Sequence, residues 1–563
     1  MKPADLDVRS ATEQAKQAVF AVRLVCCAST GCNSSGSMSI QDAMKKQLKA
    51  AGVDTLVQIV PTGCMGLCSK GPLIYMNSKT HPDILFTEIT AELAEKLLAE
   101  VVIPSAKGVK NELPPLLAKH TLSLDLPFFT KQVKVVLENN GRVNPESIDD
   151  FIAHDGYKGL RRALEMTPEE VCVEMKASGL RGRGGAGFMT GVKWDMTRKV
   201  VGDNKYIICN GDEGDPGAFM DRSVLEGDPH AVIEGMLIAA HAVGANRGMF
   251  YIRAEYPLAV ERVEKALRHA RAAGIIGKNV LETGWAFDAE IRLGAGAFVC
   301  GEETALIASC EGKRGTPRPR PPFPAVKGLW DLPTCINNVE TLANVTRIMR
   351  KGAAWYAAMG TEKSKGTKVF AVTGKIANNG LIEVPMGITL REIVEDMCGG
   401  TGTDRTVKAI QTGGPSGGLI PASKFDTPVS YESLIELGSM MGSGGMIVID
   451  DSDSVVDLAR FYLEFCVDES CGKCAPCRIG GKQLLTILER IADGHGSEKD
   501  IDLAKRVAQA MKKASLCGLG QTAPNPVLSS LRYFPEEFAE RMQKPGGEPV
   551  GGGCHGNGTC GKH

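Results

Sequence analysis

The hydrophobic pattern of the first hundred residues predicts a small α/β unit. Short apolar runs bounded by polar residues are typical of buried strands, and serine or threonine before an apolar repeat indicates where a helix begins. The predicted strands cover residues 19–26, 58–60 and 72–76. The predicted helices begin at Ser37 or Ser39 and at Thr90.

Three further units follow along the chain. The second alternates strands with helices, which predicts an α/β sheet; the third has short alternating strands; the fourth has only helical spacing. Strands are expected at 206–209, 249–253 and 290–293, then at 369–374, 383–385, 409–412 and 446–449. Helices are expected at 168–178, 257–273 and 390–397, then at 455–466, 479–491, 501–513 and 526–533.

Composition indicates a water-soluble multidomain protein. At 563 residues the chain has room for about four domains. Because 65 basic residues nearly balance 66 acidic ones, the net charge of −1 favours neither nucleic acid nor an anionic membrane as a partner. No apolar run reaches the ~20 residues that a membrane-spanning helix needs, and residues 1–16 lack an apolar signal core. We therefore expect a cytoplasmic protein.

A glycine-rich stretch at 179–194 is the first candidate ligand site. Six glycines, two arginines and a lysine leave backbone N–H groups bare and supply cations, which suits a phosphorylated cofactor. Gly182, Gly184 and Gly187 spell G-x-G-x-x-G, but a capped helix from Thr167 precedes them instead of the strand of a dinucleotide fingerprint. A flexible surface turn is the alternative, although Phe188 and Trp194 in so polar a stretch favour a lined pocket.

Two other loops and a proline-rich arm have matching chemistry. The acidic loop at 210–222 directly follows a strand, where open α/β sheets bind ligands, so its carboxylates could accept hydrogen bonds from flavin or ribose hydroxyls. The loop at 294–305 is a glycine-rich turn from strand to helix, which favours an anionic ligand at the helix N-terminus. Proline stiffens the basic stretch at 316–324, which alone would indicate a linker or a peptide ligand but beside two cofactor loops could be a stiff basic arm.

Many of the 18 cysteines occur in tight groups, which in a reducing compartment indicates metal binding. Two pairs near the N-terminus suit a [2Fe–2S] cluster, and three cysteines at two-residue gaps with a remote fourth suit a [4Fe–4S] cluster. The first set is Cys27, Cys32, Cys64 and Cys68; the second is Cys471, Cys474, Cys477 and Cys517. Strand alternation points Cys26 away from its set, and Cys466 fits a core thiol. Four sulfurs also suit zinc, so zinc remains the alternative at both sites.

The C-terminal glycine-rich tail contains a third group of potential ligands, which are Cys554, His555, Cys560 and His563. Two thiols and two imidazoles are enough for a zinc site. A disordered glycine tail is an equally good interpretation. The group could also complete a site with another subunit.

Together these motifs resemble the FMN- and NADH-binding subunit of complex I and its relatives in NAD-linked hydrogenases and formate dehydrogenases. The resemblance rests on 179–194, 206–222, 298–312 and 316–345 and covers nearly the whole chain; details such as Gly-Asp-Pro-Gly-Ala-Phe-Met-Asp look most like the beta subunit of multimeric [FeFe]-hydrogenases. It implies an α/β multidomain fold with a leader and a tail. The implied parts are a leader (1–18), a thioredoxin-like [2Fe–2S] domain (19–105), a Rossmann-like FMN- and NADH-binding domain (106–366), a β-grasp domain of SLBB type (367–450), a helical-bundle [4Fe–4S] domain (451–540) and the tail (541–563).

The same resemblance assigns cofactor residues. For FMN they are Gly182, Arg183, Gly184, Gly185, Gly187, Lys193, Asn210, Asp212, Glu213, Gly301, Glu302, Asn337 and Asn338. For NAD(H) they are Phe188, Asp215, Glu303, Arg320 and Phe323. Three positions depart from the respiratory pattern: Asp215 replaces Glu, Phe298 replaces Tyr and Arg320 replaces Lys. A shorter acid and a guanidinium could admit a 2′-phosphate, which puts the expected preference for NADH over NADPH in doubt.

The implied activity is electron transfer between NADH, FMN and iron–sulfur clusters in a multi-subunit, hydrogenase-type oxidoreductase, with electron bifurcation conceivable. The resemblance also implies a catalytic partner of hydrogenase or formate dehydrogenase type and a small thioredoxin-like [2Fe–2S] subunit, in a multimer of heteromers. The alternatives are the diaphorase subunit of an NAD-dependent formate dehydrogenase, a quinone-reducing respiratory module, and a non-catalytic electron-relay scaffold.

Overall fold

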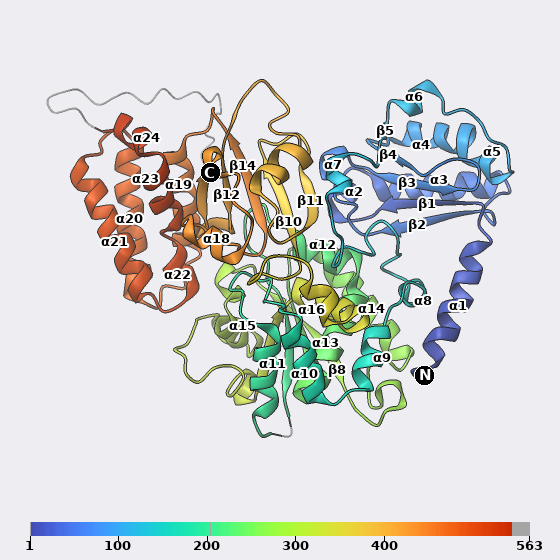
Figure 1. The fold of residues 1–563 in the computed structure, drawn as a ribbon, viewed down its shortest axis with the longest axis horizontal. Helices are drawn as coiled ribbons and strands as arrows, with labels where there is room; N and C mark the ends of the chain where they lie inside the picture. Colours follow the sequence, from blue (N-terminus) through green and yellow to red (C-terminus); the bar gives the residue numbers. More distant parts are fainter. Residues whose placement is uncertain (1, 203, 543–563) are drawn as a thin grey trace.

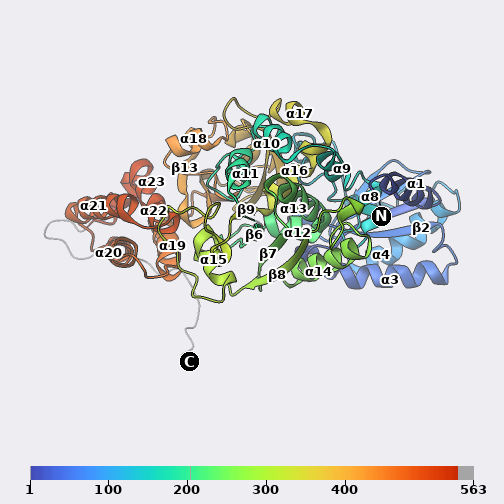
Figure 2. The ribbon, with the colours of Figure 1, turned by 90° about the horizontal axis from the view of Figure 1, so that it is seen from below.

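The computed structural model describes residues 2–202 and 204–542. The chain passes from an N-terminal α/β unit at one end of the molecule, through a central α/β unit and a third, mixed sheet, to a group of helices at the other end (Figure 1). In the view from below, the N-terminal unit and the C-terminal helices again lie at opposite ends (Figure 2).

The N-terminal unit is a five-stranded sheet in the order β2-β1-β3-β4-β5, covered by helices. Its elements are α1 (Asp5–Ala18), β1 (Val22–Cys27), α2 (Thr30–Ser34), α3 (Ser37–Ala50), β2 (Val57–Thr62), η1 (Cys68–Lys70), β3 (Ile74–Ser78), β4 (Ile84–Phe86), α4 (Ala91–Leu97), η2 (Leu98–Val102), α5 (Ile103–Ala106), α6 (Pro115–Ala118) and β5 (Thr121–Leu122). The Thr90 side chain caps α4 by accepting the N–H of Leu93, as its sequence predicts.

The central unit is a parallel sheet in the order β8-β7-β6-β9. Its strands are β6 (Tyr206–Gly211), β7 (Arg247–Arg253), β8 (Asp288–Gly294) and β9 (Thr334–Asn338). The helix α7 (Pro127–Thr130) precedes this unit and packs through Phe128 into the core of the third unit. The helices of the central unit are α8 (Ile148–Ala153), α9 (Lys158–Leu164), α10 (Pro168–Ala177), α11 (Thr190–Lys199), α12 (Met220–Gly227), α13 (Pro229–Val243), α14 (Pro257–Ala272), η3 (Val280–Glu282), η4 (Phe298–Gly301), α15 (Glu303–Cys310), η5 (Leu329–Asp331), α16 (Val339–Lys351) and α17 (Ala353–Ala357). The buried helices α13 and α16 belong to the largest apolar core.

The strand order of the central sheet predicts where a ligand binds. From β6 the chain moves outward to β7 and β8, then returns to place β9 on the other side of β6. The order therefore reverses between β6 and β9, and open α/β sheets bind ligands at the carboxyl ends of strands at such a switch point. Asn210 lies at that end of β6, and Asn337 and Asn338 lie at that end of β9.

The third unit is a mixed sheet in the order β11-β10-β14-β12-β13. It contains β10 (Thr367–Gly374), β11 (Gly380–Pro385), η6 (Glu392–Met397), β12 (Val407–Thr412), η7 (Gly414–Ser416), β13 (Gly418–Pro421), η8 (Ala422–Lys424), α18 (Tyr431–Glu436) and β14 (Gly445–Asp450). The helical unit follows as α19 (Val455–Asp468), α20 (Ala475–Ala492), α21 (Glu498–Ala514), α22 (Gly518–Thr522), α23 (Asn525–Tyr533) and α24 (Pro535–Glu540). The predicted fold class is thus confirmed as multidomain α/β with a helical end.

Two of the expected boundaries differ in the structure. The expected leader is helix α1, whose Gln17 side chain donates to Asp150 of α8 at 2.8 Å, so it packs on the central unit. The first sheet also continues past residue 105, because β5 pairs with β4. Among the described residues, no helix combines the length and apolar character needed to cross a membrane.

Candidate cofactor and metal sites

A cavity of about 510 Å³ opens at the switch point between β6 and β9. Ligand cavities typically span roughly 300–1,000 Å³. The expected site residues that line it are Gly182, Gly184, Gly187, Phe188, Lys193, Asn210, Gly301, Glu302, Glu303, Arg320, Phe323, Asn337 and Asn338. The structure therefore brings together loops that lie far apart in the sequence. Prediction from motifs missed other lining residues, including Thr190, Met196, Ile336, Thr341 and Gly518.

The glycine loop connects two helices rather than a strand and a helix. It leaves α10 after Ala177 and enters α11 at Thr190. The N–H of Gly182 donates to the Phe188 carbonyl at 2.8 Å, which folds the loop back on itself. A Cβ added at Gly184 would lie 3.0 Å from the Cβ of Asn338. The loop therefore needs glycine there so that its backbone can lie against the end of β9.

Side chains behind the cavity fix its wall. The fully buried indole of Trp194 donates to Asn337 Oδ1 at 2.9 Å, so Trp194 orients Asn337 and does not itself line the cavity. Asn338 Nδ2 donates to Asp221 at 2.6 Å. Lys193 Nζ donates to the Ile336 carbonyl at 3.1 Å and lines the cavity. Lys193 and Arg320 are the two cations among the residues that line the cavity.

Arg183 and Gly185 are two expected FMN residues that lie outside the lining. The Arg183 side chain is fully buried, and its guanidinium donates to the carbonyls of Thr367 and Lys365 and to the Tyr356 hydroxyl. Arg183 therefore ties the glycine loop to the third unit. Gly185 forms an isolated β-bridge with Gly442. Its φ of 117° is a backbone conformation that favours glycine, which explains why a glycine occupies this position.

Glu213 and Asp215 in the acidic loop also have structural partners. Both oxygens of Glu213 accept backbone N–H groups, from Asp221 and Arg222 at 3.0 Å, so this carboxylate caps α12. Asp215 accepts the Ser443 hydroxyl at 2.6 Å, and burial raises its pKa to about 6. Neither side chain lines the cavity.

The second glycine-rich turn, at 294–305, was expected to present a helix N-terminus to an anionic ligand, and the structure differs from this expectation. The Glu302 carboxylate accepts the N–H groups of Thr304 and Ala305 at 2.9 Å. The N-terminus of α15 is therefore already capped, and the expectation that it offers these donors to an anionic ligand is corrected. Glu302 and Gly301 still line the cavity beside Glu303.

Asp212 lies beside the cavity, and neither of its buried carboxylate oxygens has a hydrogen-bond partner among the described residues. A Cβ added at Gly301 would lie 3.6 Å from Asp212 Oδ2, so this carboxylate stands directly behind a lining glycine. Burial raises its pKa to about 7, with Glu255, Glu469 and Asp215 adding to the shift and Arg253 opposing it. A ligand with several hydroxyl donors would satisfy Asp212.

We expect the flavin-free protein to lose stability as pH rises toward 7. In the fold the Asp212 pKa lies near 7, above its ordinary value of 3.8, so protonation favours the folded state. The stabilisation is complete below about pH 4 and is lost as pH rises through about 7. Melting temperature against pH should show this fall in the native sequence and a smaller one in Asp212→Asn. Identical profiles for the two proteins would contradict the assignment.

These features fit FMN. The volume suits a ligand of that size, the glycine backbone and Lys193 suit a phosphate, and Asp212 suits the hydroxyls of a ribityl chain. On the open side, Phe188 and Phe323 are 49% and 48% exposed and both line the cavity, so each ring presents surface on which a nucleotide could stack. The Arg320 guanidinium lies 5.9 Å from the centre of the Phe323 ring. Glu303 and Arg320 form an ion pair at 2.6 Å on the same wall.

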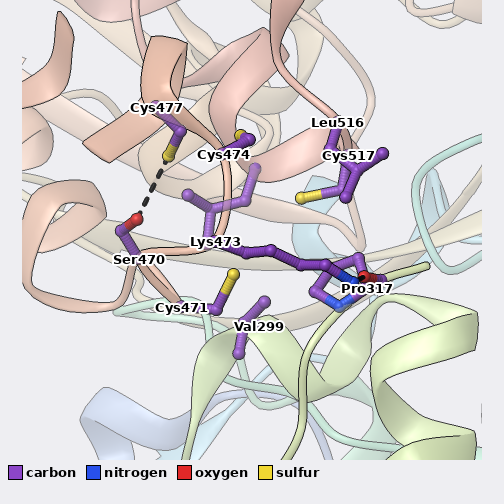
Figure 3. A pocket seen from close by; sticks show the side chains of 10 residues that line it. Val299, Pro317, Ser470, Cys471, Lys473, Cys474, Cys477, Leu516 and Cys517 are labelled. Atoms are coloured by element: carbon purple, nitrogen blue, oxygen red, sulfur yellow. Dashed lines mark hydrogen bonds between the residues drawn. The ribbon is translucent and has the colours of Figure 1, made fainter. Parts of the chain in front are cut away.

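The four cysteines of the helical unit line one small pocket, together with Val299, Pro317, Ser470, Lys473, Leu516 and Leu519. The sulfur atoms of Cys471, Cys477 and Cys517 point toward a common centre (Figure 3). Cys466 lies apart on α19, where its thiol donates to the Pro415 carbonyl, as expected of a core thiol. Gly518, next to Cys517, lines the 510 Å³ cavity. The cysteine pocket and the cofactor cavity therefore share one segment of chain.

Ser470 is a residue of this pocket that motif spacing did not reveal. Its Oγ lies 3.2 Å from the sulfur of Cys477 (Figure 3). A hydroxyl that donates to a ligand sulfur stabilises the more reduced, more negative cluster and so raises its reduction potential.

We expect Ser470→Ala to lower the midpoint potential of the [4Fe–4S] cluster. One hydrogen bond of about 0.5–1.5 kcal/mol corresponds to roughly 20–60 mV for a single electron. Redox titration followed by electron paramagnetic resonance (EPR) measures the shift. Ser470→Thr keeps the hydroxyl and serves as the control. An unchanged potential in Ser470→Ala would show that the contact does not tune the cluster.

The N-terminal set of cysteines also converges. The sulfurs of Cys64 and Cys68 lie 3.7 Å apart. The pKa of Cys27 lies well below its ordinary range because its sulfur accepts from the thiols of Cys32 and Cys64 and from backbone N–H groups. Cys26 belongs to the opposite apolar core, and its thiol faces the Leu24 carbonyl, so the expectation from strand alternation is confirmed.

Side chains of the central unit hold the backbone around this cysteine site by hydrogen bonds. Buried Glu226 accepts the backbone N–H and the hydroxyl of Thr30, and Arg262 donates to the Ala28 carbonyl at 2.8 Å. Asn140 donates to the carbonyl of Cys64 itself at 3.0 Å. Sequence spacing gave no sign of these contacts. The expected ligands Cys554, His555, Cys560 and His563 lie outside the described residues.

Comparison with known proteins agrees with the three sites. Residues 175–347 match the Nuo51 FMN-binding domain, 457–541 match the NADH-ubiquinone oxidoreductase-F iron-sulfur binding region, and 14–101 match the thioredoxin-like [2Fe-2S] ferredoxin. Both four-cysteine sites lie inside these iron–sulfur matches. The chain thus contains FMN-binding, [2Fe–2S] and [4Fe–4S] domains, and the zinc alternatives for these two sites are set aside.

Individual relatives cover most of the chain. It is 55% identical over 408 residues to the NADP-reducing hydrogenase subunit HndC of Solidesulfovibrio fructosivorans, covering 72% of this chain and 83% of that one. It is 40% identical over 404 residues to the F subunit of the NADH-quinone oxidoreductase of Escherichia coli strain K12, covering 71% and 91%. A solved NAD+-reducing [NiFe]-hydrogenase in the H2-reduced state superposes with a TM-score of 0.65 at 28% identity, covering 96% and 90%. The chain belongs to the complex I 51 kDa-type family of FMN-binding, iron–sulfur proteins.

Proposed function

We propose that this chain is the NAD(H)-linked flavin subunit of a hydrogenase-type, multi-subunit oxidoreductase. The observation that carries the proposal is the segment Cys517–Gly518, because one residue belongs to the four-cysteine pocket and the next lines the cofactor cavity. Electron transfer between two centres requires that they lie close together. FMN, when bound, supplies chemistry that exchanges a hydride with a nicotinamide and single electrons with a cluster.

We assign the protein groups roles in binding and orientation. The backbone of the glycine loop and Lys193 hold the phosphate, and Asp212 accepts ribityl hydroxyls. Asn338, held by Asp221, and Asn337, held by Trp194, present fixed amide groups to the flavin from the end of β9. Fixed polar groups need no reorganisation during the reaction. Four other residues do not line the cavity but hold the loops around it in place; they are Arg183, Gly185, Glu213 and Asp215.

The open side of the cavity is assigned to NAD(H). Phe188 and Phe323 would enclose the nucleotide rings, and the Glu303 carboxylate would accept ribose hydroxyls. Arg320 already pairs with Glu303 at 2.6 Å, which reduces the repulsion that this acid would exert on a 2′-phosphate. We propose NADH as the preferred nucleotide. The HndC relative is named as NADP-reducing, so both nucleotides belong in the assay.

We expect Glu303→Gln to weaken nucleotide use and to leave the cofactors in place. Loss of a charge-assisted hydrogen bond of about 1.5–3 kcal/mol should lower kcat/KM for NADH roughly 10- to 100-fold. Steady-state assays with NADH and ferricyanide test this, with iron and flavin content as controls. The ratio of NADPH to NADH use should rise because the acid no longer repels a phosphate. Unchanged NADH kinetics would contradict the role of Glu303.

We further propose its partners. They are a hydrogenase-type catalytic subunit and a small thioredoxin-like [2Fe–2S] subunit, assembled as a multimer of heteromers in the cytoplasm. The hydrogenase names of the HndC relative and the solved neighbour favour this over the formate dehydrogenase alternative. The non-catalytic relay is disfavoured because the cavity keeps its glycine and aromatic walls.

The test is to purify the native assembly and identify its subunits. We expect NADH-dependent viologen reduction, hydrogen-dependent NAD+ reduction and no quinone activity. A requirement for both NADH and reduced ferredoxin in hydrogen production would assign the bifurcating type. A formate dehydrogenase subunit in place of a hydrogenase subunit would overturn the assignment of partner, and flavin that NADH does not bleach would overturn the catalytic function itself.

A further inference from the structure

Arg181 joins the glycine loop of the cofactor cavity to helix α18 of the third unit. Its partners there are Tyr431 and Glu432, the first two residues of α18. The Arg181 guanidinium lies 4.2 Å from the centre of the Tyr431 ring and donates to the Glu432 carboxylate at 2.5 Å. Residues 251 positions apart in the sequence therefore meet beside the glycine loop.

Two side chains of this cluster hold carbonyl groups of the loop. Arg181 Nε donates to the Gly187 carbonyl at 2.6 Å, and the Tyr431 hydroxyl donates to the Gly182 carbonyl at 2.8 Å. Gly182 and Gly187 both line the cavity. Since the N–H of Gly182 also donates to the Phe188 carbonyl, Arg181 and Tyr431 together hold the folded-back loop on both of its sides.

The Tyr431 ring also determines which residue fits at position 187. A Cβ added at Gly187 would lie 2.7 Å from Tyr431 Cε1, and the φ of Gly187 is 64°, a left-handed conformation that favours glycine. Tyr431 is buried, and its backbone N–H donates to Ser364 Oγ at 3.3 Å. The Ser364 hydroxyl donates to Glu432 at 2.8 Å. The helix end that contacts the loop is thus itself fixed by the segment before β10.

The contacts of Arg181 fit a support for the loop better than a phosphate ligand. Arg181 is not among the described residues that line the cavity. Its Nε donates to the Gly187 carbonyl, and its Nη1 donates to Glu432 and to the Lys363 carbonyl. A guanidinium presents several donors in one rigid plane, so it can serve these acceptors and still stack on a ring.

We propose that Arg181 and Tyr431 are positioning residues for the flavin and for Phe188, and that the third unit is thereby part of the cofactor site. The proposal rests on the proposed function, because it takes the cavity to bind FMN. A glycine loop binds through its backbone, so its affinity depends on N–H groups that are in place before the ligand arrives. Two side chains that hold the loop reduce the entropy that binding would otherwise cost.

Tyr431→Phe tests the support of Gly182. The change keeps the ring beside Arg181 and removes only the hydroxyl, so the FMN affinity of the flavin-free protein should fall about 2- to 10-fold. Titration followed by quenching of FMN fluorescence measures this affinity without any assay of activity. Because Tyr431 carries no charge, the loss would not come from a missing phosphate contact. An unchanged Kd would overturn the role of Tyr431.

Arg181→Lys tests the support of Gly187 and Phe188. An ammonium lacks the fork that serves the Gly187 carbonyl and Glu432 together, so FMN affinity should fall about tenfold or more. At saturating FMN, KM for NADH should rise several-fold while kcat changes less, because Phe188 lies on the nucleotide side. A simple loss of active protein would lower kcat instead. Native FMN affinity with a native KM would overturn the role of Arg181.

Arg532 and Tyr533 provide matched controls. The Arg532 guanidinium lies 4.8 Å from the centre of the Tyr533 ring, and the Tyr533 hydroxyl donates to the Leu437 carbonyl at 3.1 Å. This pair has the same chemistry, and neither residue lines the cavity. Arg532→Lys and Tyr533→Phe should therefore leave the Kd of FMN and the KM for NADH unchanged. Losses equal to those of the two test variants would indicate general loosening of the fold and would overturn the proposal.

Failure of this proposal can be distinguished from failure of the proposed function. If the native chain binds no FMN, or binds FMN that NADH does not bleach, the proposed function is wrong. If the native chain passes both tests and the variants Arg181→Lys and Tyr431→Phe bind FMN as tightly as it does, only the positioning role is wrong. Native circular dichroism and retention of both clusters show that each variant is folded.

Discussion

Cys517→Ser should remove the [4Fe–4S] cluster and reduce NADH-dependent viologen reduction to background, while NADH still bleaches the flavin. Cys517 is one of four cysteines that line the cluster pocket, and the cluster needs a thiolate at each corner. Because the residue after it lines the cofactor cavity, the proposed route carries electrons from the flavin to this cluster. Iron content, the EPR spectrum of the reduced protein and the two activities measure the effect.

Cys466→Ala is the control for this change. Cys466 is a buried thiol of the same helical unit that does not line the cluster pocket. Iron content and viologen reduction should therefore match those of the native protein. Viologen reduction at the native rate in Cys517→Ser, from protein shown to lack the cluster, would mean that electrons leave the flavin by another route.

Gly184→Val should abolish stable FMN binding under dilute conditions. The new Cβ would meet Asn338 at 3.0 Å, and the two methyl groups would either enter the cavity or push the glycine loop from the end of β9. Overpacking of about 1–3 kcal/mol lowers affinity roughly 10- to 100-fold. Flavin content after gel filtration and titration of the flavin-free protein with FMN measure the loss.

Gly202→Ala is the matched control, because a Cβ there would make only an ordinary contact of 3.8 Å with Pro333, outside the cavity. Flavin content should be unchanged in it. Normal FMN affinity in Gly184→Val would show that the glycine loop does not hold the cofactor. Circular dichroism and retention of both clusters would distinguish loss of the flavin from loss of the fold.

Motif spacing predicted the positions of the sites well, because residues that are close together in the sequence are also held close together in space. The spacing of Cys471, Cys474 and Cys477 constrains three sulfurs to one loop, and Cys517 was predicted as the remote fourth ligand that a [4Fe–4S] cluster needs. The carboxyl ends of β6 and β9 were predictable for a similar reason, since a parallel sheet gathers them at one edge. Most of the expected cofactor residues accordingly line one cavity.

The direction of individual side chains was much harder to predict. Arg183 and Glu213 have the residue types that bind a flavin, yet one guanidinium ties the loop to β10 and one carboxylate caps α12. Burial of a charged group requires compensating partners, and those partners come from distant segments that a local motif does not reveal. The contacts of Glu226 and Asn140 with the N-terminal cysteine site were missed for the same reason.

Two domain boundaries were hard to predict because the elements beside them are short or polar. β5 has two residues and pairs only at the edge of the first sheet, so no periodic pattern marks it. α1 has a polar sequence that suggests a free leader, but its Leu6 is buried in the core of the central unit. Both elements gain their stability from packing rather than from local propensity.

The most direct measurement is the behaviour of the visible flavin absorbance of the purified, iron-loaded chain when NADH is added without oxygen. The account predicts about one FMN released per chain on acid extraction, bleaching of that absorbance by NADH, and reduction of the [4Fe–4S] cluster in the same sample by EPR. A folded chain with both clusters but no extractable FMN, or with FMN that NADH leaves oxidised, would contradict the account.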